Sequence, residues 1–95
     1  MKKHINIKIF GLVQGVFFRV GAKHEAEKLG IFGFAKNESD RTVYIEAEGE
    51  KKDLDKFINW CKEGPDLAKV EKIEVKTSSL KHFKTFSRDY KDYLD

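Results

Sequence analysis

Alternating hydrophobic and polar side chains mark two segments of this chain as strands of a half-covered sheet. Ile5, Ile7 and Ile9 occupy every second position between residues 4 and 10, and this period of two places them on one face of an extended strand. Residues 42–48 alternate in the same way. Shorter hydrophobic runs predict three further strands: residues 32–37, a segment containing Val70, Ile73 and Val75, and a short segment containing Phe83 and Phe86.

Two other segments carry hydrophobic residues at helical spacing. Residues 19–29 are followed by Gly30, at the position of a left-handed C-terminal cap. Residues 51–62 carry an i, i+3, i+4, i+7 stripe and are followed by the helix-terminating pair Gly64-Pro65. The stripes consist of Ala22, Ala26 and Leu29 in the first helix, and of Leu54, Phe57, Ile58 and Cys61 in the second.

The order of these elements is β-α-β-β-α-β with a short fifth edge strand. Right-handed crossovers allow both helices to cover one face of an antiparallel sheet, so we predict an α+β, ferredoxin-like sandwich. The chain has 95 residues and no internal linker or shift of composition, which predicts a single domain over residues 1–95. Many functions occur on this topology, so the fold does not decide among them.

Composition narrows the functional classes. One cysteine excludes an internal disulfide, and no apolar run is long enough for a signal peptide or a membrane span. We therefore expect a cytoplasmic protein that binds no membrane. The net charge is +3, from 19 basic and 16 acidic residues. Its lysines are scattered among acids, whereas nucleic-acid binders cluster basic residues in a stripe, so no nucleic-acid partner is expected.

Candidate chemistry lies in residues 11–19, between the first strand and the first helix. Two glycines allow the backbone to turn tightly and to point successive N–H groups at one position. Such a loop at the positive end of a helix suits a phosphate-sized anion, and Arg19 adds a planar fork that matches two phosphate oxygens. The residues alone leave open a plain strand-to-helix loop with a surface arginine.

The same segment resembles the signature of the acylphosphatase family. The match is Gly11-x-Val13-Gln14-Gly15-Val16-x-Phe18-Arg19. A second family pattern follows in the correct order, as Gly33-Phe34-Ala35-Lys36-Asn37 with Val43 and Gly49, and Trp60 and Gly64-Pro65-x-x-Ala68-x-Val70 resemble later family positions. The similarity covers residues 5–76.

This resemblance implies an acylphosphatase that hydrolyses carboxyl-phosphate anhydrides. Arg19 and Asn37 would be the catalytic residues, with Asn37 positioning the attacking water. The substrate's own phosphate oxygen would accept the proton, without a covalent intermediate, a metal or a cofactor. Inorganic phosphate would be product and inhibitor, and a monomer would suffice. The expected phosphate-binding residues are Gln14, Gly15, Val16, Phe17, Phe18 and Arg19.

Three features depart from the family pattern. Arg41 stands where the family usually has glycine after the asparagine, so the turn at 38–41 is expected to use another conformation, because arginine is strained at positive φ. Leu12 replaces a residue that is commonly basic. The ending from Phe83 to Asp95 differs from the usual one, and residues 87–95 are expected to fray.

Several other conspicuous residues are expected to have ordinary structural roles. The three histidines lack ligand spacing and are predicted to be surface residues. Cys61 completes a helical stripe and is predicted to be a buried thiol, and Trp60 is predicted to lie in the core. Three glutamates are predicted to lie on a solvated strand face and at a helix start. The histidines are His4, His24 and His82, and the glutamates are Glu46, Glu48 and Glu50.

Two alternatives remain. RNA-recognition domains share the order of elements, and residues 31–35 echo part of their aromatic signature, although after the first helix rather than on the third strand. The second alternative is an accessory domain that binds phosphate without turnover. Similar domains occur within a larger carbamoyl-transfer protein of hydrogenase maturation. Retention of both Arg19 and Asn37 favours the enzyme.

Overall fold

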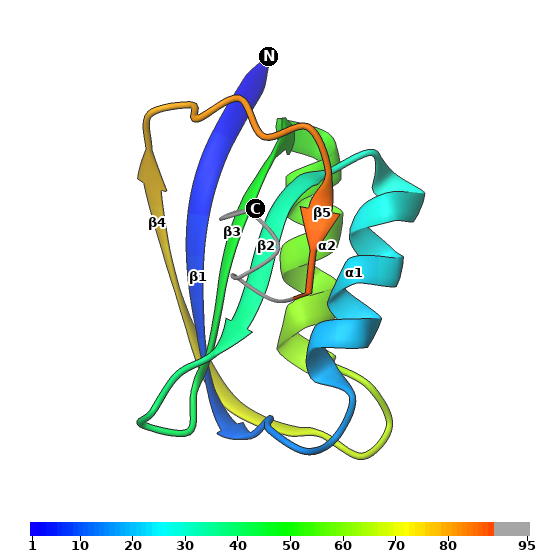
Figure 1. Cartoon of the computed structure of the whole chain (residues 1–95), viewed down its shortest axis with the longest axis vertical. Coiled ribbons are helices and arrows are strands. Elements are labelled where there is room, and N and C mark those ends of the chain that lie inside the picture. Colours follow the sequence, from blue (N-terminus) through cyan, green and yellow to red (C-terminus); the bar gives the residue numbers. More distant parts are fainter. Residues whose placement is uncertain (89–95) are drawn as a thin grey trace.

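The helices and strands follow one another in the predicted order. The structure, a computed structural model, describes residues 1–88. Figure 1 shows both helices packed on one face of the sheet. The elements are β1 (Lys2–Leu12), α1 (Phe18–Leu29), β2 (Phe32–Asn37), β3 (Val43–Glu50), α2 (Lys51–Glu63), β4 (Lys69–Ser78) and β5 (Phe86–Ser87). The α+β, ferredoxin-like prediction is confirmed.

The sheet is mixed rather than wholly antiparallel. Its strand order is β4-β1-β3-β2-β5, and the first four strands pair antiparallel. β5 pairs in parallel with β2, joining Gly33 to Phe86 and Phe34 to Ser87. Phe83 precedes this strand instead of belonging to it. The expectation of fraying is wrong for Ser87, which is 6% exposed; residues 89–95 lie outside the described residues.

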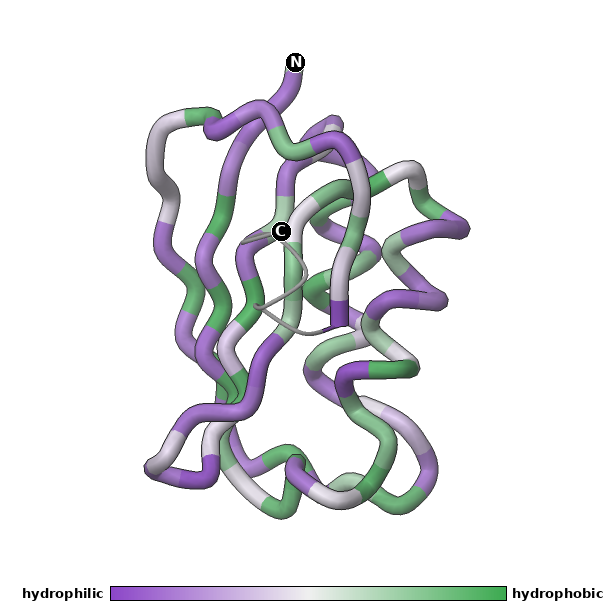
Figure 2. Tube along the Cα trace, viewed as in Figure 1, coloured by the Kyte–Doolittle hydropathy of each residue, from purple (hydrophilic) through white to green (hydrophobic). Residues whose placement is uncertain are grey.

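The predicted alternation determines which face of the sheet is buried under the helices. Ile7 pairs with Ile45 across β1 and β3, and both side chains are fully buried. Figure 2 shows the alternation of hydrophobic and hydrophilic residues along these strands. Each large apolar side chain buried in this way contributes about 1.5–3 kcal/mol to folding. Cys61 is buried, as predicted, and Trp60 is partly buried against the core.

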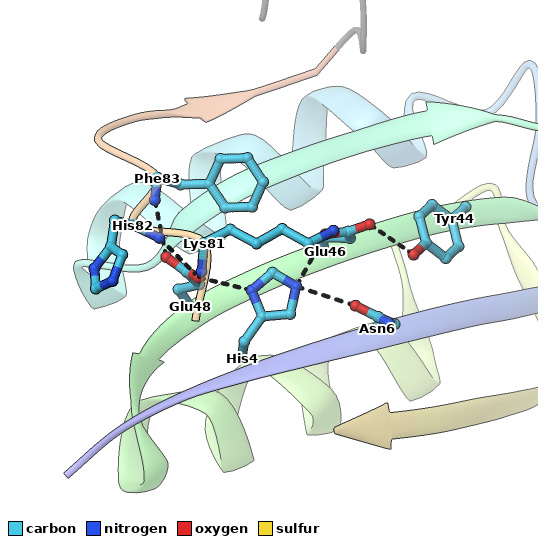
Figure 3. Close-up of polar contacts among 8 residues, drawn as sticks. All are labelled: His4, Asn6, Tyr44, Glu46, Glu48, Lys81, His82 and Phe83. Atoms are coloured by element: carbon cyan, nitrogen blue, oxygen red, sulfur yellow. Dashed lines mark hydrogen bonds and ion pairs between the residues drawn. The ribbon is translucent and has the colours of Figure 1, made fainter. Parts of the chain in front are cut away.

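The opposite face of the sheet holds a polar cluster, which we define as the buried residues His4, Glu46 and Glu48 together with the exposed Lys81 (Figure 3). The His4 ring lies between two carboxylates, with Nδ1 2.8 Å from Glu48 Oε2 and Nε2 2.9 Å from Glu46 Oε1. Lys81 Nζ donates to Glu46 at 2.8 Å. The prediction that His4, Glu46 and Glu48 are solvated is therefore wrong, since they are only 1%, 7% and 4% exposed. His24, His82 and Glu50 are exposed, as predicted.

Burial of the cluster follows from the course of residues 79–88, which we call the C-terminal segment. This segment crosses the end of the sheet between β4 and β5 (Figure 1). Glu48 accepts backbone N–H groups from Lys81, His82 and Phe83. The Phe83 ring stacks on the His4 ring at 5.8 Å. The cluster thus fixes the start of the C-terminal segment, and β5 fixes its end.

The cluster makes stability depend on acid pH. Burial opposes ionisation of Glu48, but hydrogen bonds from the Lys81 amide, His4 and the Phe83 amide outweigh it, so its pKa lies below the ordinary 4.5. The pKa of Glu46 is likewise lowered despite burial, by hydrogen bonds from Lys81, Tyr44 and His4. Near pH 4 the unfolded chain therefore binds more protons than the folded one, and the free energy of unfolding falls as pH decreases below about 4.5.

Glu48→Gln is expected to flatten this dependence. The variant should be less stable than the parent at pH 7, and the difference should shrink as the pH falls below about 4.5 and the parent's carboxyl becomes protonated. Urea unfolding at pH 7, 5, 4 and 3 measures the difference. Glu50→Gln, at an exposed position, serves as control. Parallel curves for parent and Glu48→Gln across this range would show that Glu48 does not carry the effect.

Candidate functional site

The loop between β1 and α1 curls its backbone around one position. Gly15 has φ 74° and Phe17 has φ 65°, with Val16 between them. Alternating left-handed residues turn successive N–H groups into a concave nest for an anion. Glycine adopts this conformation freely, whereas Phe17 holds it at a cost of about 1–3 kcal/mol, a kind of strain that concentrates at functional sites.

The amino end of α1 opens into the same loop. The first N–H groups of a helix lack carbonyl partners within the helix. Phe17 is the N-cap residue, and no side chain within residues 1–88 caps this helix. The first turn contains no acidic residue. The amides of Phe18, Arg19 and Val20 are therefore available, at the positive end of the helix dipole.

These elements border a cavity of about 330 Å³, near the lower end of the range for small-ligand sites. Its lining includes Arg19 from α1 and Asn37 from the end of β2, so the two predicted catalytic residues face one space. Arg88 contributes a second guanidinium, and no acidic residue lines the cavity within the described part of the chain. The lining residues are Val13, Gly15, Phe17, Phe18, Arg19, Val20, Asn37 and Arg88.

A hydrogen bond to the C-terminal segment orients the Arg19 side chain. Its Nη1 donates to the carbonyl oxygen of Arg88 at 3.3 Å. One turn further along α1, Lys23 Nζ donates to the carbonyl oxygen of Phe86 at 3.1 Å. The contact with Arg88 holds one side of the Arg19 guanidinium and leaves its remaining donors for a ligand, and the contact of Lys23 attaches the C-terminal segment to α1.

Gln14 connects the loop to the β2–β3 hairpin. Its Nε2 donates to the carbonyl oxygens of Glu38 at 2.8 Å and Thr42 at 3.0 Å. Both side-chain N–H groups of Gln14 are therefore used to bind the backbone of the hairpin turn that follows Asn37. Gln14 sets the distance between the loop and Asn37, and only its main chain is left to contact an anion.

The hairpin turn differs from the expectation drawn from Arg41. Arg41 adopts φ 73°, so the turn keeps a left-handed residue although glycine is absent. Glu38 N–H donates to Thr42 O at 2.9 Å, and Arg41 N–H donates to Glu38 O at 3.1 Å. Asp40 accepts from the backbone N–H and the hydroxyl of Thr42 at 3.1 and 2.5 Å. Hydrogen bonds from Thr42 and Lys8 lower the pKa of Asp40 to about 2, and the turn's bonds offset its strain.

The other expected residues fall into two groups. Gly15, Phe17 and Phe18 line the cavity; Phe17 is 70% exposed, whereas Phe18 is 2% exposed and packs edge-on against Trp60 at 5.3 Å. Val16 is buried and does not line the cavity. Val13, Val20 and Arg88 also line the cavity and are not among the expected residues. Arg88 carried one signal, because arginine is rare in this lysine-rich chain.

The described residues offer little for metal or membrane chemistry. Within residues 1–88, no group of three or more histidine, cysteine, aspartate or glutamate side chains is arranged to hold a metal ion. Neither α1 nor α2 has the length and apolar character needed to cross a lipid bilayer. Burial raises the pKa of the Cys61 thiol well above its usual range, so this cysteine is not a nucleophile at neutral pH.

The fold and the cavity define an α+β domain with a loop of open amides and two arginines suited to an anionic ligand. The family model described as Acylphosphatase matches residues 5–88. An acylphosphatase from Archaeoglobus fulgidus is 43% identical over 86 residues, covering 90% of this chain and 97% of the relative. The chain belongs to the acylphosphatase family.

Solved structures agree with this assignment. The crystal structure of acylphosphatase from Bacillus subtilis superposes with a TM-score of 0.90 at 38% identity, covering 95% of this chain and 100% of that one. A structure of full-length HypF in its phosphate- and nucleotide-bound form matches with a TM-score of 0.87 at 38% identity. That match covers 93% of this chain but 12% of HypF. The RNA-recognition alternative gains no support from these relatives.

Proposed function

We propose that this protein hydrolyses acyl phosphates to a carboxylate and inorganic phosphate, the known activity of its family. The observation that carries the proposal is that Arg19 of α1 and Asn37 of β2 line one cavity beside the open amides of the loop. A metal or cofactor is not needed for the mechanism below.

The phosphoryl group would sit in the loop. Main-chain N–H groups from Gln14 to Arg19 and the Arg19 guanidinium would donate to its oxygens. Such donors are preorganised for the charge that collects on these oxygens in the transition state. The surrounding charge favours a dianion because Arg19 lies at the positive end of α1 and no described acid lines the cavity.

Asn37 would position the attacking water. Its carboxamide can accept one hydrogen bond and donate another without titrating near neutral pH. Asn37 is exposed at the end of β2, and its backbone is fixed by pairing with Val43. Gln14 holds this end of the hairpin against the loop, so the water and the phosphorus would be aligned by one rigid frame.

The chemical step needs few groups. The water oxygen forms a bond to phosphorus while the bond from phosphorus to the acyl oxygen breaks, and its electron pair leaves with the carboxylate. One water proton passes to a phosphoryl oxygen, which yields dihydrogen phosphate. A carboxylate is a good leaving group, so no general acid is required.

An assay of the purified protein with benzoyl phosphate, without added metal and with chelator present, tests the function. We expect saturable hydrolysis that inorganic phosphate inhibits competitively. The HypF match keeps an accessory role as the second candidate. Phosphate binding by calorimetry without turnover of benzoyl or acetyl phosphate would favour that role and reject the enzyme.

We further propose that residues 1–95 act as one monomeric domain in the cytoplasm. The cavity is lined by residues of a single chain, and the one cysteine is a buried free thiol, which suits a reducing compartment. Sedimentation of the active protein at assay concentrations tests the monomer.

A further inference from the structure

Arg88 gives the cavity more positive charge than the phosphoryl group requires. Only three arginines occur in the chain, and two of them, Arg19 and Arg88, line this one cavity. A phosphoryl dianion in the loop would already be matched by the helix amides and Arg19. The guanidinium of Arg88 is then available for a different part of the substrate.

The backbone of Arg88 is held in place from both sides. β5, which ends at Ser87, pairs with β2, and the carbonyl oxygen of Thr85 accepts from Gly33 N–H at 2.8 Å. The carbonyl oxygen of Arg88 accepts from Arg19 at 3.3 Å. The fold therefore fixes the backbone of Arg88 beside the cavity.

The Arg88 side chain is exposed, and no acidic side chain among residues 1–88 forms an ion pair with it. Two exposed apolar side chains, Phe17 and Val20, lie on the same lining, 70% and 43% exposed. They form an apolar surface beside the loop on which the carbon frame of an acyl group can rest. The cavity thus combines a phosphate loop, an apolar surface and a guanidinium that forms no ion pair with the described acids.

We propose that Arg88 is a specificity-determining residue that selects acyl phosphates whose acyl group carries a second carboxylate. This inference rests on the proposed function. The carboxylate would accept a two-pronged hydrogen bond from the guanidinium, which matches carboxylate geometry. The favoured substrates would be monoacyl phosphates of dicarboxylic acids.

Benzoyl phosphate and its 3-carboxy and 4-carboxy derivatives make a matched set, because they share the reacting group and differ in one remote charge. For Arg88→Gln we expect kcat/KM for at least one carboxylated substrate to fall by about five- to tenfold, the range of an exposed charge-assisted hydrogen bond. Hydrolysis of benzoyl phosphate and inhibition by inorganic phosphate should change by less than about twofold. Arg88→Lys should recover part of the preference, and Arg41→Gln, outside this cavity, should leave it unchanged.

Each other outcome has a defined meaning. An equal loss for all three substrates, or weaker phosphate inhibition, would place Arg88 in phosphate binding or folding and overturn the proposal. Unchanged kinetics for both carboxylated substrates would overturn it as well. If the unaltered protein hydrolyses none of the three compounds, the proposed function itself fails.

Discussion

Replacing Arg19 with alanine is expected to lower kcat/KM for benzoyl phosphate about a thousandfold, the scale for removal of a preorganised transition-state donor. The inhibition constant of inorganic phosphate should rise as well, because the guanidinium would contact the phosphoryl group before and during reaction. Steady-state kinetics with phosphate inhibition measures both effects.

Folding should survive this substitution. The Arg19 side chain makes one hydrogen bond that the structure describes, to the Arg88 carbonyl, so the free energy of unfolding should change by no more than about 1 kcal/mol. Arg19→Lys retains the charge without the planar fork and should recover only part of the activity. Arg41→Ala is the matched control. Near-normal turnover by a folded Arg19→Ala protein would remove the guanidinium from the mechanism.

Asn37→Ala is expected to act on turnover alone. We expect kcat to fall by about a hundredfold or more, because the water loses its positioning group, while phosphate inhibition stays within about twofold of its original value. The residue is exposed and its backbone pairing with Val43 is retained, so stability should be preserved. Kinetics and phosphate calorimetry on the same preparation separate the two effects.

Asn59→Ala provides the control, since Asn59 is an exposed asparagine on α2, away from the cavity. A loss of phosphate affinity as large as the loss of kcat in Asn37→Ala would mean that this side chain holds the phosphate. Unchanged kcat would mean that the water is positioned by another group.

The helices and the long strands could be predicted because each has a strong local periodicity. The helix expected at 19–29 is observed at Phe18–Leu29, and that at 51–62 is observed at Lys51–Glu63. β5 has two residues, too few for any alternation to show direction. Its parallel pairing with β2 depends on how the C-terminal segment crosses the sheet, which no local pattern records.

The polar cluster shows what alternation alone cannot predict. Glu46 and Glu48 alternate with hydrophobic residues along β3, which is also how a solvated strand face reads. They become buried because residues 81–83 bring three N–H groups to Glu48 and the Lys81 ammonium to Glu46. The alternation along a strand carries no information about a segment from elsewhere in the chain that covers the strand.

The sequence was sufficient to predict that Arg19 and Asn37 share the candidate site, but not that Arg88 lines it. The signature places Arg19 and Asn37 in one site, and the structure brings both to one cavity. Arg88 lies in a segment that reads as a polar tail, so its arrival at the cavity could not be inferred. Arg41 adopts the left-handed conformation although arginine replaces glycine there, because neighbouring hydrogen bonds hold the turn.

A crystal structure of the protein with bound inorganic phosphate tests most directly whether the loop and the guanidinium form the phosphate site. We predict phosphate oxygens about 3 Å from main-chain N–H groups of residues 14–19 and from the Arg19 guanidinium, with an ordered water between the phosphorus and the Asn37 carboxamide. Phosphate bound elsewhere, with this loop empty at saturating concentration, would contradict that arrangement.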